Sequence, residues 1–353
     1  MKNNIRASLI LLLATVVLCC GLYPLALFGV GRLLFPSAAA GSLIEGKGGA
    51  GSQGSRLIAQ PFTAPEYFWP RPSAASYNAT ASGGSNWGAN NPKLRDRVCQ
   101  QIGPILVYKQ GSRSAGAGPK PRTPQQDIDA WFAAVPDRAA AWASASSTGP
   151  VNWARTDLSG EAYGLQGEYI RQWANEHPEV LEAWKKSNPN ADAPKPEDLV
   201  TPFFASFARV HPGRWPGVVE VAQTDGTKVK RIEPVASDPA VHANFFDLWV
   251  SDPANRDKAA DLEPVIADMV TTSGSGLDPH ITLRNALSVY QLDRVAAKRA
   301  PSDSEADSTR AEIEKLVRAH AFTPLAGLVG EPLVNVLELN LALDERFPTS
   351  AVR

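Results

Sequence analysis

Hydrophobic and polar positions divide the chain into one long apolar stretch and a remainder of short apolar runs separated by polar turns. Residues 7–31 contain no charged residue. Lys2 and Arg6 precede this stretch, and no acidic residue lies between these two basic residues. A helix rises about 1.5 Å per residue, so this stretch reaches about 37 Å, enough to cross a hydrocarbon core of roughly 30 Å. The pattern predicts one transmembrane helix, which Tyr23 and Pro24 should kink without ending.

The charges before this helix predict its orientation. Lysine and arginine are enriched on the cytoplasmic side of transmembrane segments, so residues 1–6 should stay in the cytoplasm and the rest should be exported. A cleaved signal peptide is the alternative, because Ala38-Ala39-Ala40 fits an A-x-A cleavage site. The apolar part of a signal peptide usually has about 7–15 residues, so the length of residues 7–31 favours a retained anchor.

Capping signals mark several helices after the anchor. Asn91 and Pro92 suit the N-cap and first position of a helix, which Gly103 and Pro104 should end. Apolar residues recur there at four-residue intervals, at Leu94, Val98 and Ile102. This spacing predicts an amphipathic helix.

The C-terminal part predicts two more helices and a strand. Thr282 should cap one helix, and Thr309 with Glu312 should form a capping box for the other. From residue 337 to 343, leucine occupies every second position. A period of two predicts a half-buried strand over these residues.

The middle of the chain is rich in tryptophan and proline. Seven of the nine tryptophans fall within residues 110–264. An aromatic residue is followed five positions later by proline at four places: Trp131/Pro136, Trp173/Pro178, Trp184/Pro189 and Phe207/Pro212. We interpret the pattern as short helices that each begin at a proline and point tryptophan side chains into a shared core, with internal duplication as its origin.

These elements predict a single N-terminal transmembrane helix followed by an exported α+β domain. Residues 32–107 and 265–353 should form that split domain, and residues 108–264 a mainly helical, tryptophan- and proline-rich insertion. Residues 37–55, rich in glycine, alanine and serine, should be a flexible juxtamembrane segment.

The amino-acid composition argues against several classes of function and structure. The net charge is −1, which predicts no nucleic-acid partner. Of the three cysteines, Cys19 and Cys20 lie in the predicted membrane span and leave Cys99 alone outside it, so a disulfide framework is excluded. A small buried apolar residue is the favoured interpretation of Cys99.

The outer segments contain an ordered series of short motifs that resembles the series of a known family. In the N-terminal part the motifs that carry the resemblance are Tyr23-Pro24, Phe35-Pro36, Gly41-Ser42-Leu43-Ile44, Gln60-Pro61-Phe62, Tyr67-Phe68, Arg71-Pro72-Ser73-Ala74, Ser82-Gly83-Gly84-Ser85-Asn86 and Asn91-Pro92. In the C-terminal part they are Ser273-Gly274-Ser275-Gly276-Leu277-Asp278-Pro279-His280-Ile281, Arg294-Val295-Ala296, Gly330-Glu331-Pro332 and Val334-Asn335-Val336-Leu337-Glu338-Leu339-Asn340. Each motif is common alone, but their number and order are specific. Together they resemble the C subunit of the Kdp-type potassium-transporting P-type ATPase (the KdpC family).

The resemblance implies a single-pass subunit of an inner-membrane complex that imports potassium at the expense of ATP. It implies two protein partners, a potassium-channel-like subunit and a P-type catalytic subunit, besides membrane lipid. The implied role is non-catalytic: stabilising assembly and raising the ATP affinity of the catalytic subunit. ATP and potassium would then be bound by the complex, and no cofactor is assigned to this chain.

The sequence predicts no catalytic residue and no metal site. It lacks a G-x-x-x-x-G-K-[ST] loop, an Asp-Lys-Thr-Gly-Thr motif and a G-x-S-x-G elbow, and its histidines lack the paired spacing of metal ligands. Two loops could offer backbone N–H groups to a phosphate or an ion, although structural turns are the favoured explanation. The residues of these loops are Ser82, Gly83, Gly84, Ser85 and Asn86 in one, and Gly274 and Gly276 in the other.

Four polar residues complete the candidates. Gln291 and Arg294 could hydrogen-bond a nucleotide, as the resemblance implies, but a surface polar pair on a helix is favoured. An exported domain would also not meet cytoplasmic ATP. Asp278 and Glu331 could attract K⁺ to an entrance, whereas for Asp278 a cap of its own turn before a proline is favoured.

Two classes of function stay open at this point. The first is a non-catalytic transporter subunit, which the outer motifs favour. The second is a signal-anchored extracytoplasmic binding protein or enzyme, in which the tryptophan-rich block would line a ligand cleft.

Overall fold

The structure is a computed structural model and describes residues 2–46, 51–118, 121–145, 149–155, 164–223, 227–236 and 239–348. Contacts divide the chain into two compact units. The first unit comprises Met1–Ser85 and Ile266–Arg353, and the second comprises Asn86–Val265. Residues 86–107, which the sequence pattern grouped with the outer segments, pack within the second unit.

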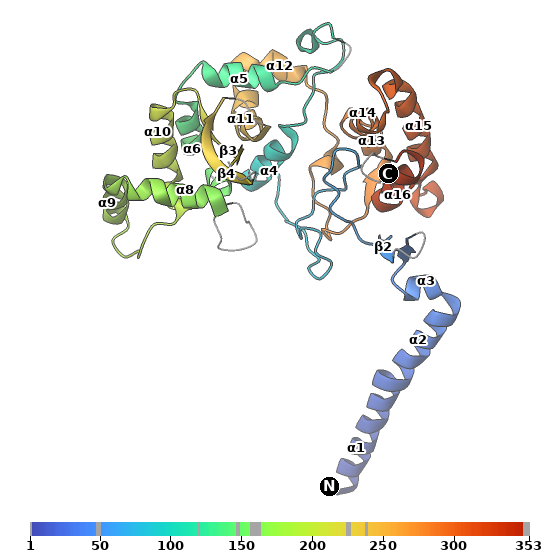
Figure 1. Cartoon of the computed structure of the whole chain (residues 1–353). Helices are drawn as coiled ribbons and strands as arrows, with labels where there is room; N and C mark the ends of the chain where they lie inside the picture. The colour runs from blue at the N-terminus through green and yellow to red at the C-terminus, as the bar shows by residue number, and fades with distance from the viewer. Residues whose placement is uncertain are drawn as a thin grey trace. The chain divides into compact units, whose positions relative to one another are not determined.

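The first unit begins with one long apolar helix. α1 (Lys2–Val16), a π-helical turn η1 (Val17–Leu22) and α2 (Tyr23–Leu34) follow one another as a single rod (Figure 1). Among the described residues it is the one helix, Asn3–Leu34, that is long and apolar enough to cross a membrane. This finding supports a membrane anchor.

The π-helical turn η1 allows the helix to accommodate Pro24. Proline has no N–H to donate, and its ring would collide with the carbonyl four residues earlier in an α-helix. Here the N–H of Tyr23 bonds to the oxygen of Leu18, five residues back, which widens the turn before the proline. The helix therefore continues through Pro24, as predicted.

A short hairpin follows the membrane helix. After α3 (Pro36–Ala39), β1 (Leu43–Glu45) pairs antiparallel with β2 (Ser52–Ser55). The predicted flexible segment 37–55 includes residues 47–50, which lie outside the described residues.

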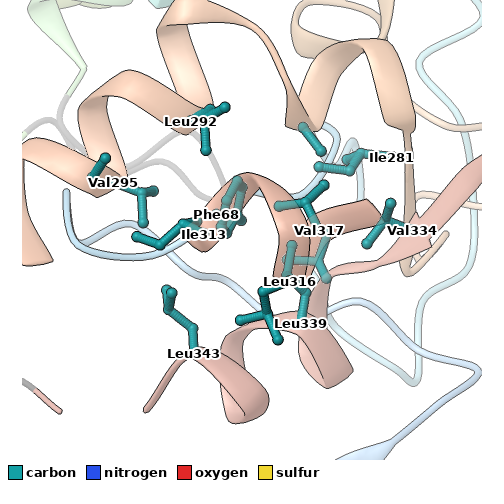
Figure 2. Close-up of a cluster of buried hydrophobic side chains, with 13 residues drawn as sticks. Phe68, Ile281, Leu292, Val295, Ile313, Leu316, Val317, Val334, Leu339 and Leu343 are labelled. Atoms are coloured by element: carbon teal, nitrogen blue, oxygen red, sulfur yellow. The ribbon is translucent and has the colours of Figure 1, made fainter. Parts of the chain in front are cut away.

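The rest of the first unit packs helices on a three-stranded sheet of order β5-β7-β6. The strands are β5 (His280–Thr282), β6 (Ala321–Phe322) and β7 (Leu333–Asn335), all antiparallel to their neighbours. The helical elements are η6 (Ala267–Met269), α13 (Leu283–Ala286), η7 (Val289–Asp293), α14 (Arg294–Arg299), η8 (Asp303–Glu305), α15 (Ala306–Ala319), η9 (Pro324–Gly327) and α16 (Val336–Arg346). Figure 2 shows Phe68 buried among aliphatic side chains of α15 and α16, so the N-terminal segment completes this core.

The predicted strand over residues 337–343 is wrong, because these residues lie in α16. Asn335 caps this helix by accepting a hydrogen bond from the N–H of Glu338. Val336, Leu339 and Leu343 are buried at helical spacing, while Leu341 is only half-buried. The sequence pattern missed this helical spacing of three and four residues because leucine also occupies every second position.

The predicted helix caps have different outcomes. Asn91 and Thr282 cap their helices as expected, with side-chain oxygens that accept from Lys93 N–H and Asn285 N–H. The capping box of Thr309 is wrong, since α15 begins at Ala306 and Thr309 is buried inside it. An earlier 3₁₀ turn starts the helix, so no side-chain cap is required at residue 309.

The second unit is mainly helical and also contains a two-stranded hairpin. Its helical elements are α4 (Pro92–Ile102), η3 (Arg113–Ala115), α5 (Gln125–Ala133), α6 (Arg138–Ala145), α7 (Gly149–Ala154), α8 (Gly164–Asn175), α9 (Pro178–Ser187), η4 (Pro196–Leu199), α10 (Val200–Val210), α11 (Pro239–Ser251), η5 (Pro253–Asn255) and α12 (Arg256–Ala260). β3 (Trp215–Ala222) pairs antiparallel with β4 (Lys228–Val235). The sequence pattern missed this hairpin.

The proline pattern predicts only part of this unit. Pro178 begins α9, but Pro136, Pro189 and Pro212 lie in turns, where a fixed φ is equally suitable. The core consists of aromatic rings in mutual contact, among them Trp142, Trp153, Trp215, Phe203, Phe204 and Phe245. Of the aromatic residues in the repeated pattern, Phe207 and Trp142, which follows Pro136 by six positions, are buried in this core, whereas Trp131, Trp173 and Trp184 are half-buried.

Candidate functional site

The two glycine- and serine-rich loops interlock within the first unit. The N–H of Gly83 donates to the oxygen of Ser275 at 2.8 Å, and the Ser82 hydroxyl donates to the same oxygen at 3.2 Å. Ser85 adds a hydroxyl contact with Thr272 at 3.2 Å. These groups are bound to each other, which supports a structural role for the loops.

A glycine is required at position 276 because the two loops approach each other closely there. Its φ is +69°, and a Cβ atom there would lie 2.6 Å from the carbonyl oxygen of Gly83. Its own oxygen accepts from the Ser73 hydroxyl at 2.5 Å. Gly274, by contrast, has open space around its Cα. On the other loop, Asn86 has a φ of +51° and is the first residue of the second unit.

Asp278 is held at the end of the second loop. It accepts hydrogen bonds from the N–H of His280 at 3.0 Å and from His280 Nδ1 at 3.1 Å, and it lies 3.4 Å from Arg71 Nη1. Burial raises the pKa of Asp278, but the His280 bonds and the Arg71 charge outweigh burial and hold the pKa below its usual range. The carboxylate therefore stays ionised and links the segment around Arg71 to the turn that leads into β5.

Glu331 is exposed, and the structure does not bring it next to Asp278. The β5–β7 register pairs His280 with Asn335 and Thr282 with Leu333. Asp278 therefore precedes one end of the ladder and Glu331 precedes the other. The two acidic side chains do not form one site.

Gln291 binds the backbone of Trp69. Its Oε1 accepts from the Trp69 N–H at 3.0 Å, and its Nε2 donates to the Trp69 oxygen at 3.0 Å. Asn340, which the sequence analysis missed, makes the same pair of bonds with Phe68, at 2.9 and 3.0 Å. Both amides are 1% exposed. The sequence signals for Asn340 were its place at the end of the motif Val334–Asn340 and its polar side chain among leucines.

Arg294 completes this arrangement. Its guanidinium donates to the oxygens of Pro65 at 2.6 Å and Tyr67 at 3.0 Å, and to Gln291 Oε1 at 2.7 Å. It also stacks over the Trp69 ring, 3.6 Å from the centroid. Burial lowers the pKa of Arg294 to about 9. Gln291 and Arg294 thus hold residues 65–69 against the helices.

Two hollows lie on the first unit. One of about 470 Å³ is lined by Leu57 and Ile58 together with the loop from Ser273 to His280. The other, about 490 Å³, lies between the β1–β2 hairpin and α16, and its lining includes Glu45, Arg56, Glu338 and Glu345. Neither contains Gln291 or Arg294. Within the described part of the chain, no group of three or more histidine, cysteine or acidic side chains could hold a metal ion.

Comparison with known proteins gives one consistent result. The family model described as "K+-transporting ATPase, c chain" (KdpC) matches residues 5–119 and 237–345. The chain is similar to the potassium-transporting ATPase KdpC subunits of Janthinobacterium sp. (strain Marseille), 43% identical over 118 residues, and Variovorax paradoxus (strain S110), 47% over 118 residues. These alignments cover 33% of this chain and 61% and 60% of the relatives, so the chain spans about three fifths of their length.

A third relative matches over the entire length. It is the potassium-transporting ATPase KdpC subunit of Koribacter versatilis (strain Ellin345), 26% identical over 355 residues, which are 100% of both chains. The central segment that the family model leaves unmatched therefore has a counterpart in at least one relative.

Proposed function

The chain belongs to the KdpC family of K+-transporting ATPase c chains, and on this premise we propose that it is a membrane-anchored, non-catalytic subunit of an ATP-driven potassium importer. The observation that carries the proposal is the ordered match of both outer segments to one family. The apolar helix Asn3–Leu34 supports the anchor. The absence of nucleotide-binding and phosphorylation motifs from the sequence supports a non-catalytic role.

The partners in this proposal are a potassium-channel-like subunit and a P-type catalytic subunit. The chain would contact them beside the membrane and stabilise their assembly. The test is purification of the tagged full-length chain from membranes in mild detergent. Two large membrane subunits should elute with it in a constant ratio, whereas a stable, solitary chain would count against the proposal.

Orientation is the second part of the proposal. We place residues 1–6 in the cytoplasm and the bulk of the chain in the periplasm, because Lys2 and Arg6 precede residues 7–31, which contain no charged residue. A reporter that is active only outside the cytoplasm, fused after Arg353, should be active. Signal from a cytoplasmic reporter at the same position would reverse the orientation.

A direct contact with ATP is not part of the proposal. Gln291 and Arg294 already bind the backbone of residues 65–69, and they lie within the first unit on the side of the membrane helix that we place in the periplasm. Any effect on the ATP affinity of the catalytic subunit would then be transmitted through protein contacts. Photolabelling of the complex with an ATP analogue should modify the catalytic subunit and leave this chain unlabelled.

Attraction of K⁺ by Asp278 and Glu331 is a separate hypothesis. It rests on the exposure of Glu331 and on the ionised state of Asp278. If long-range charge concentrates K⁺, Asp278→Asn with Glu331→Gln should raise the K⁺ concentration for half-maximal ATPase activity at low ionic strength, and salt should abolish the difference. An unchanged value at low salt would reject it.

The central tryptophans of the second unit do not support the alternative of a ligand-binding protein. Trp142, Trp153 and Trp215 are buried in ring-to-ring contact, so they fill a core and do not line an open cleft.

A further inference from the structure

Several buried polar atoms at the start of α13 have no hydrogen-bond partner among the described residues. The Asn285 side chain is 1% exposed, and both its Oδ1 and its Nδ2 are unpaired. Asp268, which is 8% exposed, has an unpaired Oδ1, and the hydroxyl oxygen of Ser288 is buried and unpaired as well. Buried polar atoms normally have a partner, so this group requires an explanation.

Thr282 connects these residues. Its N–H donates to Asp268 Oδ2 at 2.7 Å, and its hydroxyl oxygen accepts from the N–H of Asn285 at 3.2 Å. In a capping box, the side chain at the third helical position reaches back to the N–H of the N-cap residue. Asn285 is at that third position, but Asp268 already occupies the N–H of Thr282. The N–H of Ser288 donates to the backbone oxygen of Asn285 at 3.0 Å, so the three unpaired side chains belong to one turn.

The Asp268 carboxylate has no basic partner within the described part of the chain. Its hydrogen bond comes from the neutral N–H of Thr282, and no lysine, arginine or histidine described in the structure pairs with it. The residue after Asn285, Ala286, belongs to the hydrophobic core, as does Ile281. A buried charge is normally paired or bound to a metal ion. A water molecule alone would satisfy the amide but would leave the charge without compensation.

We propose that this turn binds an alkali-metal cation, with Asp268 Oδ1, Asn285 Oδ1 and Ser288 Oγ as ligands. Carboxylate, amide and hydroxyl oxygens are the donors that such hard ions prefer. One carboxylate balances one positive charge, whereas calcium sites usually collect several. A cation here would fasten the segment before β5 to α13 and stabilise the first unit. This role goes beyond the proposed function and requires no partner subunit.

Amide hydrogen exchange of the full-length chain in detergent tests the proposal. The chain is compared in choline chloride, potassium chloride and sodium chloride at one ionic strength, because choline is too large for a buried site. At about ten times the dissociation constant of the bound cation, peptides that cover residues 280–288 should exchange about tenfold more slowly than in choline.

Two results would overturn the proposal. Equal exchange in the three salts is the first, and it is the result that an ordered water in place of the cation would give. Protection by magnesium or calcium chloride without protection by either alkali salt is the second, because it would contradict the argument from a single carboxylate.

Substitutions assign the effect to this turn. Asp268→Asn removes the charge and Asn285→Leu removes the amide, and each should abolish the difference between choline and alkali salts. Asp307→Asn, which neutralises an exposed acid of α15, is the matched control and should keep the full difference. An alkali effect that persists in both site variants would reject the assignment. The comparison of salts on the wild-type chain can reject the proposal even if a variant folds poorly.

Discussion

Two buried amides determine how the extended segment around Phe68 and Trp69 is held. Asn340 and Gln291 each pair with the N–H and the C=O of one of these residues, as a neighbouring strand would. Buried backbone groups need such partners, because an unpaired one loses its bonds to water without replacement. The segment can therefore pass through the core without belonging to a sheet.

Replacing Asn340 should destabilise the first unit strongly. Asn340→Leu keeps the volume but leaves the Phe68 N–H and C=O buried without partners, so unfolding should become easier by about 2–4 kcal/mol. Thermal unfolding in detergent, followed by tryptophan fluorescence, measures the change. Asn175→Ala, at an exposed helix position, is the control and should change stability by less than about 0.5 kcal/mol. Equal effects of the two variants would show that the Phe68 contact is unimportant.

Asp278 should make the stability of its loop depend on pH. Its folded pKa lies below the unfolded value, so the contribution is complete above the unfolded pKa, near 4, and is lost as pH falls through the folded pKa. Asp278→Asn should therefore lower the unfolding temperature at pH 7, and the gap to wild type should close under acid conditions. A gap that stays constant from pH 7 to pH 3 would show that charge is not the cause.

At the scale of elements, α16 shows how a leucine pattern can mislead. Leucine at every second position satisfies a strand, yet Asn335 and Glu338 start a helix, and the core accepts the residues spaced three and four apart. The predicted helices at residues 91 and 282 are confirmed because a single side chain and the next few N–H groups decide them.

Substitution of two leucines distinguishes the observed helix from the predicted strand. In a strand with period two, Leu341 and Leu343 would be on one face and would contribute similarly. In α16, Leu343 is fully buried and Leu341 is half-buried beside an open hollow. Leu343→Ala should therefore cost about 2–5 kcal/mol of stability, and Leu341→Ala about 1 kcal/mol. Equal losses in a thermal unfolding assay would argue for the strand.

At the scale of the whole molecule, the two units have separate cores. The first core uses residues from both outer segments, and the second is the aromatic cluster. The family model leaves residues 120–236 unmatched, but the second unit also includes matched residues such as those of α4. The segment that the family model leaves unmatched therefore packs together with flanking matched residues in one unit.

Deletion at the unit boundaries should leave the first unit intact. The Ser85 hydroxyl lies 3.2 Å from the hydroxyl of Thr272, which is six residues after the unit boundary at Ile266. A linker of about six residues can therefore join Ser85 to Ile266 in place of residues 86–265. We expect this variant to fold and to purify with the complex. Removal of residues 110–264 alone should give a poorly soluble chain, because α4 would lose α11, on which it packs. If only the second variant assembles, the unit boundary is wrong.

Features that depend on composition or on close neighbours could be predicted from the sequence alone. An uncharged apolar stretch indicates a membrane helix wherever the chain later folds, and a capping residue acts on N–H groups two or three positions away. The family, too, was recognisable from ordered motifs alone. The roles of Gln291 and Asn340 could be seen only in the folded chain. Phe68 and Asn340 are 272 residues apart, and whether a polar group or a leucine meets protein or water depends on distant segments that no local pattern records.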